Sequence, residues 1–329
     1  MPKPPSWAFV KPMQTPAAIP YLVVVDQGAL IPALRPDLDE ADKPVNASKR
    51  FTIRIGDVPI AVESDALLPD WEILPAYRPF ITDDKGDVVL GLHSGIPEMP
   101  TGKKVFDSSP IWTLHRHHHT SVIKIFDNFS GLKRVLVLPP DLKRADLYFE
   151  EKYDHFLSPF AGPAMELLMI NYLARAGGVI LHACSIERQG KGYLFAGQSG
   201  AGKSTLATLW DQQKGVEVLS DDRTIVRKQD GQFRMYGTPW HGDATFGSAR
   251  GVKLERIFFL GHGHKNAVRE LKGAGAMLQF LQCSFPPYWD APGMESAMEK
   301  FEELATRVSC CELSFKPDDS AIGFVEGIR

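Results

Sequence analysis

The sequence predicts an α/β protein with two domains: a β-rich amino-terminal domain at residues 1–155, and a second domain, residues 156–329, with a mixed sheet around a phosphate loop. Three observations support this. A complete phosphate-loop motif lies between an apolar run and a helix-forming run. The strand before the loop is reached through a short hairpin, which requires an antiparallel pair in that sheet. Short alternating strands with Gly, Asp, Asn and Pro turns occupy the chain from residue 51 to residue 138.

Length and charge limit the function classes. At 329 residues the chain exceeds the usual single-domain size. Its 37 Lys and Arg against 40 Asp and Glu leave a net charge of −3 with the signs interspersed, so we expect no nucleic-acid partner and no membrane partner. Apolar runs too short for a bilayer, and an amino terminus unlike a signal peptide, indicate a cytoplasmic protein. Homo-oligomerisation is left open. The four cysteines lack metal-site spacing and are predicted to be buried thiols.

The amino-terminal domain is predicted from turns and alternation. Its first 50 residues are rich in Pro, Ala and Asp and are expected to be irregular, apart from a strand-like run at residues 21–26. Six strands are then expected at residues 51–55, 59–62, 88–92, 111–114, 121–126 and 133–138. In a strand, His115, His117 and His119 of the run His115-Arg116-His117-His118-His119 would share one face. That face would suit a metal, but an exposed polar face is the commoner explanation, and no metal is predicted there.

The second domain is predicted from helical spacing and glycine breaks. A helix at 163–176 has Pro at its first position and Gly177 as terminator. Strands at 179–187 and 193–196 form the hairpin that leads into the loop. A helix at 204–213 follows, and a strand at 216–220 should run parallel to the strand before the loop. Helices at 275–282 and 296–307, with Phe301 and Leu304 facing the core, and a strand at 310–315 complete the domain.

The phosphate loop predicts ATP binding. Its members are Gly197, Gln198, Ser199, Gly200, Ala201, Gly202, Lys203, Ser204 and Thr205. The glycines let successive N–H groups point into one cavity, and the helix N-terminus adds its positive end. Lys203 supplies a cation for the β- and γ-phosphates, and Ser204 offers a hydroxyl to Mg²⁺. The alternative is a glycine-rich turn that only caps a helix.

Two carboxylates and a histidine extend this site. Asp221 and Asp222 end the next strand, at the edge of the sheet where α/β ligand sites form. One of them would hold Mg²⁺, and the other would take a proton from an attacking hydroxyl. An Asp pair that opens a turn, with Asp222 paired to Arg223, is the alternative. His182 lies in an apolar strand, and is equally compatible with a core position and with a place near the phosphates.

Two further segments are candidates for binding a substrate. The glycine-punctuated segment 237–251 suits a mobile substrate loop, in which Trp240 and His241 would contact the substrate and Arg250 would neutralise the transferring phosphate. The same segment is equally compatible with a loop that only connects two strands. The aromatic turn at 285–289 would be able to line a cleft, but a packed loop is favoured.

The motifs together resemble those of one family. His182-Ala183-Cys184, the Gly190 turn, the phosphate loop and Asp221-Asp222-Arg223 are similar to the catalytic domain of HPr kinase/phosphorylase, whose fold is related to phosphoenolpyruvate carboxykinase. The resemblance covers residues 160–260. It implies a mixed-sheet phosphate-loop fold, His182 near the transferred phosphate, Asp221 as acid/base at the substrate serine, and Asp222 in the Mg²⁺ site.

The departures from this family point to a different substrate. Segment 237–242 replaces the glycine-rich segment that follows the aspartates in true HPr kinases, and nothing before residue 150 resembles their amino-terminal domain. The chain is more similar to HPr-kinase-related proteins, some of which phosphorylate serine on ribosomally made peptides. HPr as substrate and the reverse phosphorolysis are therefore not supported.

The resulting prediction is an ATP- and Mg²⁺-dependent kinase that acts on a hydroxyl, namely a serine of a peptide or protein. The alternatives are a nucleotide-sensing regulatory protein without catalysis, and a small-molecule kinase. Asp221 discriminates between the serine kinase and the nucleotide sensor, because a sensor does not need a second carboxylate beside its metal ligand.

Overall fold

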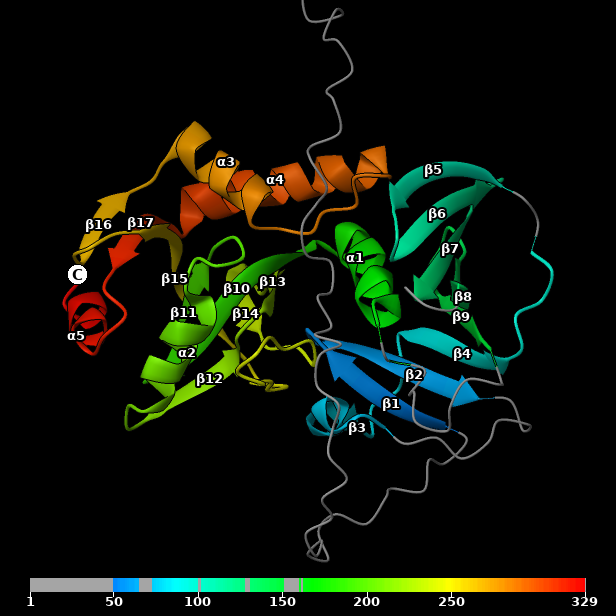
Figure 1. Cartoon of the computed structure of the whole chain (residues 1–329), viewed down its shortest axis with the longest axis horizontal. Coiled ribbons are helices and arrows are strands. Elements are labelled where there is room, and N and C mark those ends of the chain that lie inside the picture. Colours follow the sequence, from blue (N-terminus) through cyan, green and yellow to red (C-terminus); the bar gives the residue numbers. More distant parts are fainter. Residues whose placement is uncertain are drawn as a thin grey trace, which may run out of the picture.

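The computed structural model describes residues 50–64, 73–99, 102–127, 131–150, 160 and 162–328. In this part of the chain two β-sheet regions flank helix α1 (Ala164–Ala176), as Figure 1 shows. The predicted α/β class is confirmed. The expected strand at 21–26 lies outside the described residues.

The amino-terminal sheet has nine described strands. Their spatial order is β3 (Ile81–Thr82), β1 (Arg50–Ile55), β2 (Val58–Ser64), β4 (Val88–Ser94), β9 (Arg144–Phe149), β8 (Gly131–Leu138), β7 (Thr120–Asp127), β6 (Trp112–His117) and β5 (Lys103–Ser108). All six predicted strands are present. β3 and β5 were not predicted, because β3 is only two residues long and β5 carries charged residues without alternation. In β9 the charged residues alternate with the buried Ala145 and Leu147, a short signal that the prediction overlooked.

Two tight turns shape this sheet. Gly56 and Asp57, with φ of 58° and 60°, join β1 to β2 in the left-handed conformation that two-residue hairpins favour. Strand β6 ends at His117, and His118, with φ of 52°, begins the turn to β7. His119 therefore does not continue the strand, and the expectation that His115, His117 and His119 share one strand face is wrong.

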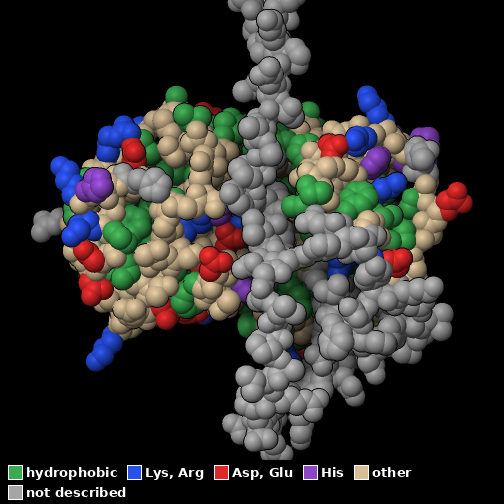
Figure 2. Space-filling view, viewed as in Figure 1, with side chains coloured by type: hydrophobic (Ala, Val, Ile, Leu, Met, Phe, Trp, Pro, Cys, Tyr) green, Lys and Arg blue, Asp and Glu red, His purple; other side chains and the backbone are tan. Residues whose placement is uncertain are grey.

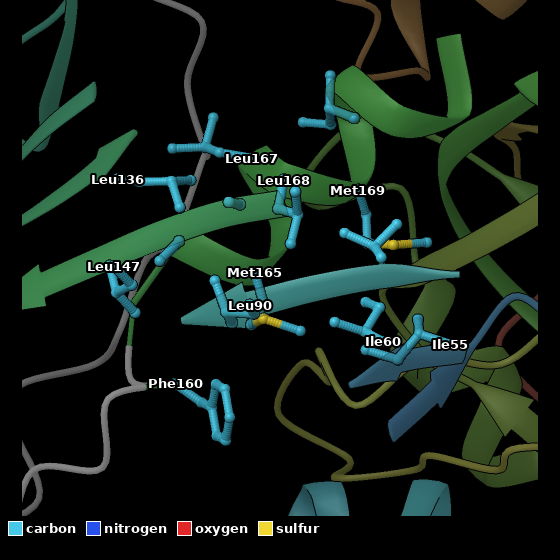
Figure 3. Close-up of a cluster of buried hydrophobic side chains, with 14 of the residues drawn as sticks. Ile55, Ile60, Leu90, Leu136, Leu147, Phe160, Met165, Leu167, Leu168 and Met169 are labelled. Carbon is cyan, nitrogen blue, oxygen red and sulfur yellow. The ribbon is translucent and has the colours of Figure 1, made fainter. Parts of the chain in front are cut away.

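Helix α1 joins the two halves of the molecule. Its side chains Met165, Leu168 and Met169 are buried in one cluster with residues of the amino-terminal sheet, such as Leu90 and Ile60 (Figure 3). The same cluster includes residues of the second sheet region, among them the fully buried Ile225. The halves thus share a continuous core, and the domain boundary at residues 155 and 156 stays a prediction.

The second sheet region contains eight described strands. They are β10 (Gly178–Arg188), β11 (Lys191–Ala196), β12 (Val216–Ser220), β13 (Arg223–Gln229), β14 (Gln232–Tyr236), β15 (Gly251–His262), β16 (Ala267–Glu270) and β17 (Ser309–Phe315). β11 pairs antiparallel with β10 and parallel with β15, so the predicted hairpin and mixed sheet are confirmed. β12 pairs antiparallel with β10 and therefore runs parallel to β11, as predicted, with β10 between them.

The remaining helices are η2 (Pro75–Phe80), a 3₁₀ helix, and α2 (Lys203–Asp211), α3 (Gly273–Gln282), α4 (Ala291–Arg307) and α5 (Ser320–Glu326). α4 begins five residues before its predicted start, because the Asp290 side chain caps it by accepting the Gly293 N–H at 3.1 Å. Phe301 and Leu304 are fully buried, as predicted.

The four cysteines are buried and free, which confirms the prediction of buried thiols. Among the described helices, none combines the length and the apolar character that crossing a membrane requires.

Candidate active site

The phosphate loop connects β11 to α2. Gly200 and Gly202 have φ of 80° and 93°, a region that other residues rarely adopt. A Cβ atom on Gly202 would lie 2.8 Å from the ring of Phe315, so the loop also needs glycine there for close packing. The first N–H groups of α2 point out of its N-terminus, because helix geometry provides no intrahelical partner for them. This arrangement fits an anion.

Lys203 is the cation of this loop. Its Nζ donates to the carbonyl oxygens of Gly197 and Gln198, both at 3.0 Å. The residue is only 6% exposed, and burial lowers its pKa to about 8, although the charge of Asp222 opposes the shift. The ammonium group therefore remains mostly protonated at neutral pH, and is held at the mouth of the loop.

A cavity of about 750 Å³ opens above the loop. The loop residues that line it are Ser199, Gly200, Gly202, Lys203, Ser204 and Thr205. Gly197, Gln198 and Ala201 are not among the lining residues. A space of this size is in the range of small-molecule sites.

His182 and Asp222 form a hydrogen-bonded pair in the same cavity. The Nε2 atom of His182 lies 2.8 Å from Oδ1 of Asp222. Burial raises the pKa of Asp222, but the hydrogen bond from His182 and the charge of Arg223 outweigh it and lower the pKa to about 2. An ionised carboxylate can only accept, so Nε2 carries the proton. Burial lowers the pKa of His182, which favours the neutral ring with Nδ1 as its basic nitrogen.

Arg223 fixes the second oxygen of Asp222. Its Nη1 donates to Asp222 Oδ2 at 2.6 Å, and its Nε donates to Glu166 Oε1 at 2.8 Å. The guanidinium carbon also lies 4.2 Å from the ring centroid of Phe285. Glu166 and Arg223 are almost fully buried, at 3% and 4% exposure. The carboxylate of Asp222 is thus held between an imidazole and a guanidinium group.

Asp221 has a different environment from its neighbour. It is fully buried and is not among the lining residues of the cavity. Its carboxylate accepts the backbone N–H groups of Gly242 at 3.0 Å and Ala244 at 2.9 Å. Burial raises its pKa, and these two hydrogen bonds oppose the shift. In this conformation Asp221 anchors the loop that follows β14.

Loop 237–250 is fastened at several points. The Thr238 hydroxyl donates to the carbonyl oxygen of Arg223 at 2.8 Å, and the Ser248 hydroxyl donates to Glu217 at 2.7 Å. Arg250 forms ion pairs with Glu217 and with Glu187, and does not line the cavity. These contacts describe a fixed loop with its arginine turned away from the phosphate loop.

Trp240 and His241 line the cavity, and their contact with a substrate stays a prediction. The indole Nε1–H of Trp240 donates to the hydroxyl of Tyr77 at 3.0 Å. The turn at 285–289, in contrast, is packed: Phe285 belongs to the buried core, and Trp289 packs edge-on against Trp112. The favoured alternative for that turn is therefore confirmed.

Sequence reasoning missed the cavity residues that precede His182, namely Leu74, Ala76, Tyr77, Phe160, Gly162 and Glu166. Glu166 had a usable signal, because a carboxylate on the apolar face of a helix calls for a buried partner. No short-range sequence signal marked Tyr77 and Phe160, because they reach the site from distant parts of the chain.

Acidic and basic side chains are interspersed on the face shown in Figure 2, in keeping with the net charge of −3. The absence of nucleic-acid and membrane partners stays a prediction.

Comparison with known proteins gives a partial match. A family described as the SynChlorMet cassette protein ScmC matches residues 164–314, which is less than half of the chain. The matched region contains His182, the phosphate loop, Asp221 and Asp222, and excludes the amino-terminal sheet. A search of curated proteins finds no match.

A solved structure, the Hpr(Ser) kinase/phosphatase from Coxiella burnetii, is similar at 13% identity over 45% of this chain and 93% of that chain, with a TM-score of 0.26. A similarity this weak carries no argument about function. The resemblance to HPr kinase therefore stays a prediction.

Proposed function

We propose that this protein binds ATP with Mg²⁺ at the phosphate loop and transfers the γ-phosphoryl group to a hydroxyl, namely a serine of a peptide or protein. One observation carries the proposal: the phosphate-loop cation Lys203 and the hydrogen-bonded pair His182–Asp222 line a single cavity. The first suits phosphate binding, and the second suits proton transfer from an acceptor.

The donor set fits Mg²⁺. The Ser204 hydroxyl and the Asp222 carboxylate both line the cavity. The described residues contain no group of three or more His, Cys, Asp or Glu side chains able to hold a metal. That is compatible with Mg²⁺, which keeps several waters and binds through one or two side chains together with substrate phosphates. When bound, the ion would neutralise charge on the β- and γ-phosphates.

Proton transfer is assigned to His182. In the neutral ring, Nδ1 is the basic nitrogen, while Asp222 holds the opposite nitrogen and so fixes the tautomer. The acceptor oxygen forms a bond to the γ-phosphorus, the bond from that phosphorus to the bridging oxygen breaks, and ADP leaves. The hydroxyl proton passes to His182. Lys203 stabilises the negative charge of the phosphates.

Two residues take different roles from those predicted by the sequence. Asp221 was predicted as the acid/base, but its burial and its two backbone hydrogen bonds support a role in anchoring loop 237–250. Arg250 was predicted to contact the transferring phosphate, but its ion pairs to Glu217 and Glu187 support a second anchor for the same loop. The His182–Asp222 pair also favours catalysis over sensing alone, because a sensor has no use for a proton acceptor beside its nucleotide.

The proposal is tested by incubating the protein with ATP, Mg²⁺ and a serine peptide library, and by following phosphopeptides by mass spectrometry. Wild type should produce phosphoserine, and Lys203→Met and His182→Gln should lower the rate by about 10² to 10⁴. Lys272→Met is the matched control, because that side chain is 75% exposed and lies outside the cavity lining. Phosphate found on a carboxylate, or equal rates in all four proteins, would contradict the proposal.

A further inference from the structure

The cavity has an apolar wall contributed largely by the amino-terminal half of the molecule. Its residues are Leu74, Ala76, Tyr77 and Phe160, joined by Pro239 and Trp240 from loop 237–250. The ring of Tyr77 stacks on Phe160, with centroids 5.1 Å apart, and its hydroxyl accepts the hydrogen bond from Trp240. Neither half of the chain forms this wall alone.

Hydrogen bonding and packing hold the residues of this wall in place. Helix η2 has Pro75 at its first position, and the Tyr77 N–H donates to the carbonyl oxygen of Leu74 at 2.8 Å. Tyr77 and Phe160 are 2% and 1% exposed, so their rings are fixed behind the wall, and the half-buried Leu74, Ala76 and Trp240 supply its accessible surface. A preformed surface of this kind binds an apolar group with little loss of side-chain entropy.

Hydrogen bonds connect the catalytic pair to Glu166, which lines the same cavity as this wall. Arg223 donates one hydrogen bond to Asp222 at 2.6 Å and another to Glu166 at 2.8 Å. Glu166 and Tyr77 then line the cavity together. In-line transfer requires the acceptor to approach the γ-phosphoryl group from the side opposite ADP, next to the proton acceptor. An acceptor held next to His182 and Asp222 would therefore share one cavity with this wall.

The charges of the cavity argue against an acidic acceptor. Three carboxylates, Glu166, Asp222 and Asp243, line it. Of the lysines and arginines among the described lining residues, Lys203 belongs to the phosphate loop and Arg223 is already engaged by two of those carboxylates. An acceptor that carries its own phosphate or carboxylate would meet repulsion without a cation to offset it.

We propose that this wall is the acceptor subsite, and that the acceptor is a peptide serine with an aromatic or large aliphatic residue beside it. The inference rests on the proposed function and specifies its substrate. The amino-terminal half of the chain is then part of the active site. The sequence offered segment 237–251 as a candidate for binding the substrate, and this wall adds residues of the amino-terminal half to it.

The test uses the full-length protein and two sets of synthetic peptides, in which the residues beside a single serine are Trp, Phe or Leu in one set and Asp or Lys in the other. Initial rates with ATP and Mg²⁺ are measured by mass spectrometry, and thermal stabilisation by ATP and Mg²⁺ is measured in parallel. Apolar flanks should raise kcat/KM by at least about tenfold, the effect of burying one large apolar side chain.

Ala76→Lys places a cation on the wall and should abolish this preference or shift it to Asp flanks, while stabilisation by ATP is retained. Val105→Lys is the matched control. Val105 is a 38%-exposed apolar residue of the same half, outside the cavity lining, and its substitution should leave the preference unchanged.

Equal rates for the two peptide sets, or faster transfer to Asp-flanked serine by wild type, would overturn the inference and leave the kinase proposal standing. Stabilisation by ATP without transfer to any peptide of either set would also overturn the inference, and it would count against the proposed transfer while leaving nucleotide binding standing. If ATP does not stabilise the protein at all, the proposed function itself fails.

Discussion

Asp222→Asn tests the core of the site most informatively. The substitution keeps the volume of the side chain and removes its charge. An amide has one accepting oxygen and one donating nitrogen, whereas Asp222 now accepts from His182 with one oxygen and from Arg223 with the other. With the proton of His182 on Nε2, a donor faces a donor whichever way the amide turns. Either one of the two contacts is lost, or His182 moves its proton to Nδ1 and no longer has a basic nitrogen there.

The cost follows from the pKa of Asp222. Its fall from 3.8 to about 2 corresponds to about 2 kcal/mol of folding free energy at neutral pH. The folded-state pKa is lowered, so this stability is fully present above the unfolded pKa and is lost as pH falls through the folded pKa. The difference between wild type and Asp222→Asn should thus be about 2 kcal/mol at pH 7, and about half of that at pH 3.

Urea denaturation followed by circular dichroism, at both pH values, measures this difference. In the phosphotransfer assay the same variant should lower turnover by about 10² to 10⁴, because His182 loses the partner that fixes its tautomer. Asp221→Asn should stay within about tenfold of wild type. A stability loss below about 0.5 kcal/mol, a loss independent of pH, or a larger catalytic defect in Asp221→Asn would refute the reasoning.

Three further predictions address neighbouring parts of the site. Phosphate binding favours the protonated form of Lys203, so calorimetric titrations should show ATP affinity weakening as pH rises through about 8, by at most about tenfold per pH unit. Glu166→Gln leaves a buried arginine short of a counter-charge and should lower the unfolding free energy by about 3 kcal/mol, whereas the exposed control Glu270→Gln should lower it by less than about 1 kcal/mol. Gly202→Ala forces a strained φ and a contact with a phenylalanine ring, so it should cost about 2 kcal/mol or more and abolish ATP binding. Gly323→Ala, in open space on α5, should be neutral or stabilising, and thermal melting of both variants measures the difference.

The fold was predictable where the signal is local. The helix ending at Gly177, the hairpin into the phosphate loop and the helix after it are marked by periodicity and by glycine or proline at fixed positions. Strand β5 carries two lysines and an aspartate and is mostly exposed, so no alternating pattern marks it. Its pairing with β6 is a tertiary effect that propensity does not contain.

The site was predictable in its residue types but only partly in their orientation. Asp221 and Asp222 are adjacent, and which carboxylate faces the cavity depends on the backbone after β12, where the Ser220 hydroxyl donates to the carbonyl oxygen of Arg223 at 2.7 Å. The contact between Tyr77 and Trp240 joins residues 163 positions apart. Short-range sequence patterns carry no information about such a pair.

Calorimetric titration of ATP in the presence of Mg²⁺, with wild type, Lys203→Met and Lys272→Met, tests nucleotide binding at the phosphate loop most directly. Wild type and the exposed-lysine control Lys272→Met should bind one ATP per chain with equal affinity. Lys203→Met should lose most of that affinity, because the main side-chain charge on the phosphates is removed. The absence of any heat of binding in wild type up to millimolar ATP, or equal affinity in all three proteins, would contradict ATP binding at this loop.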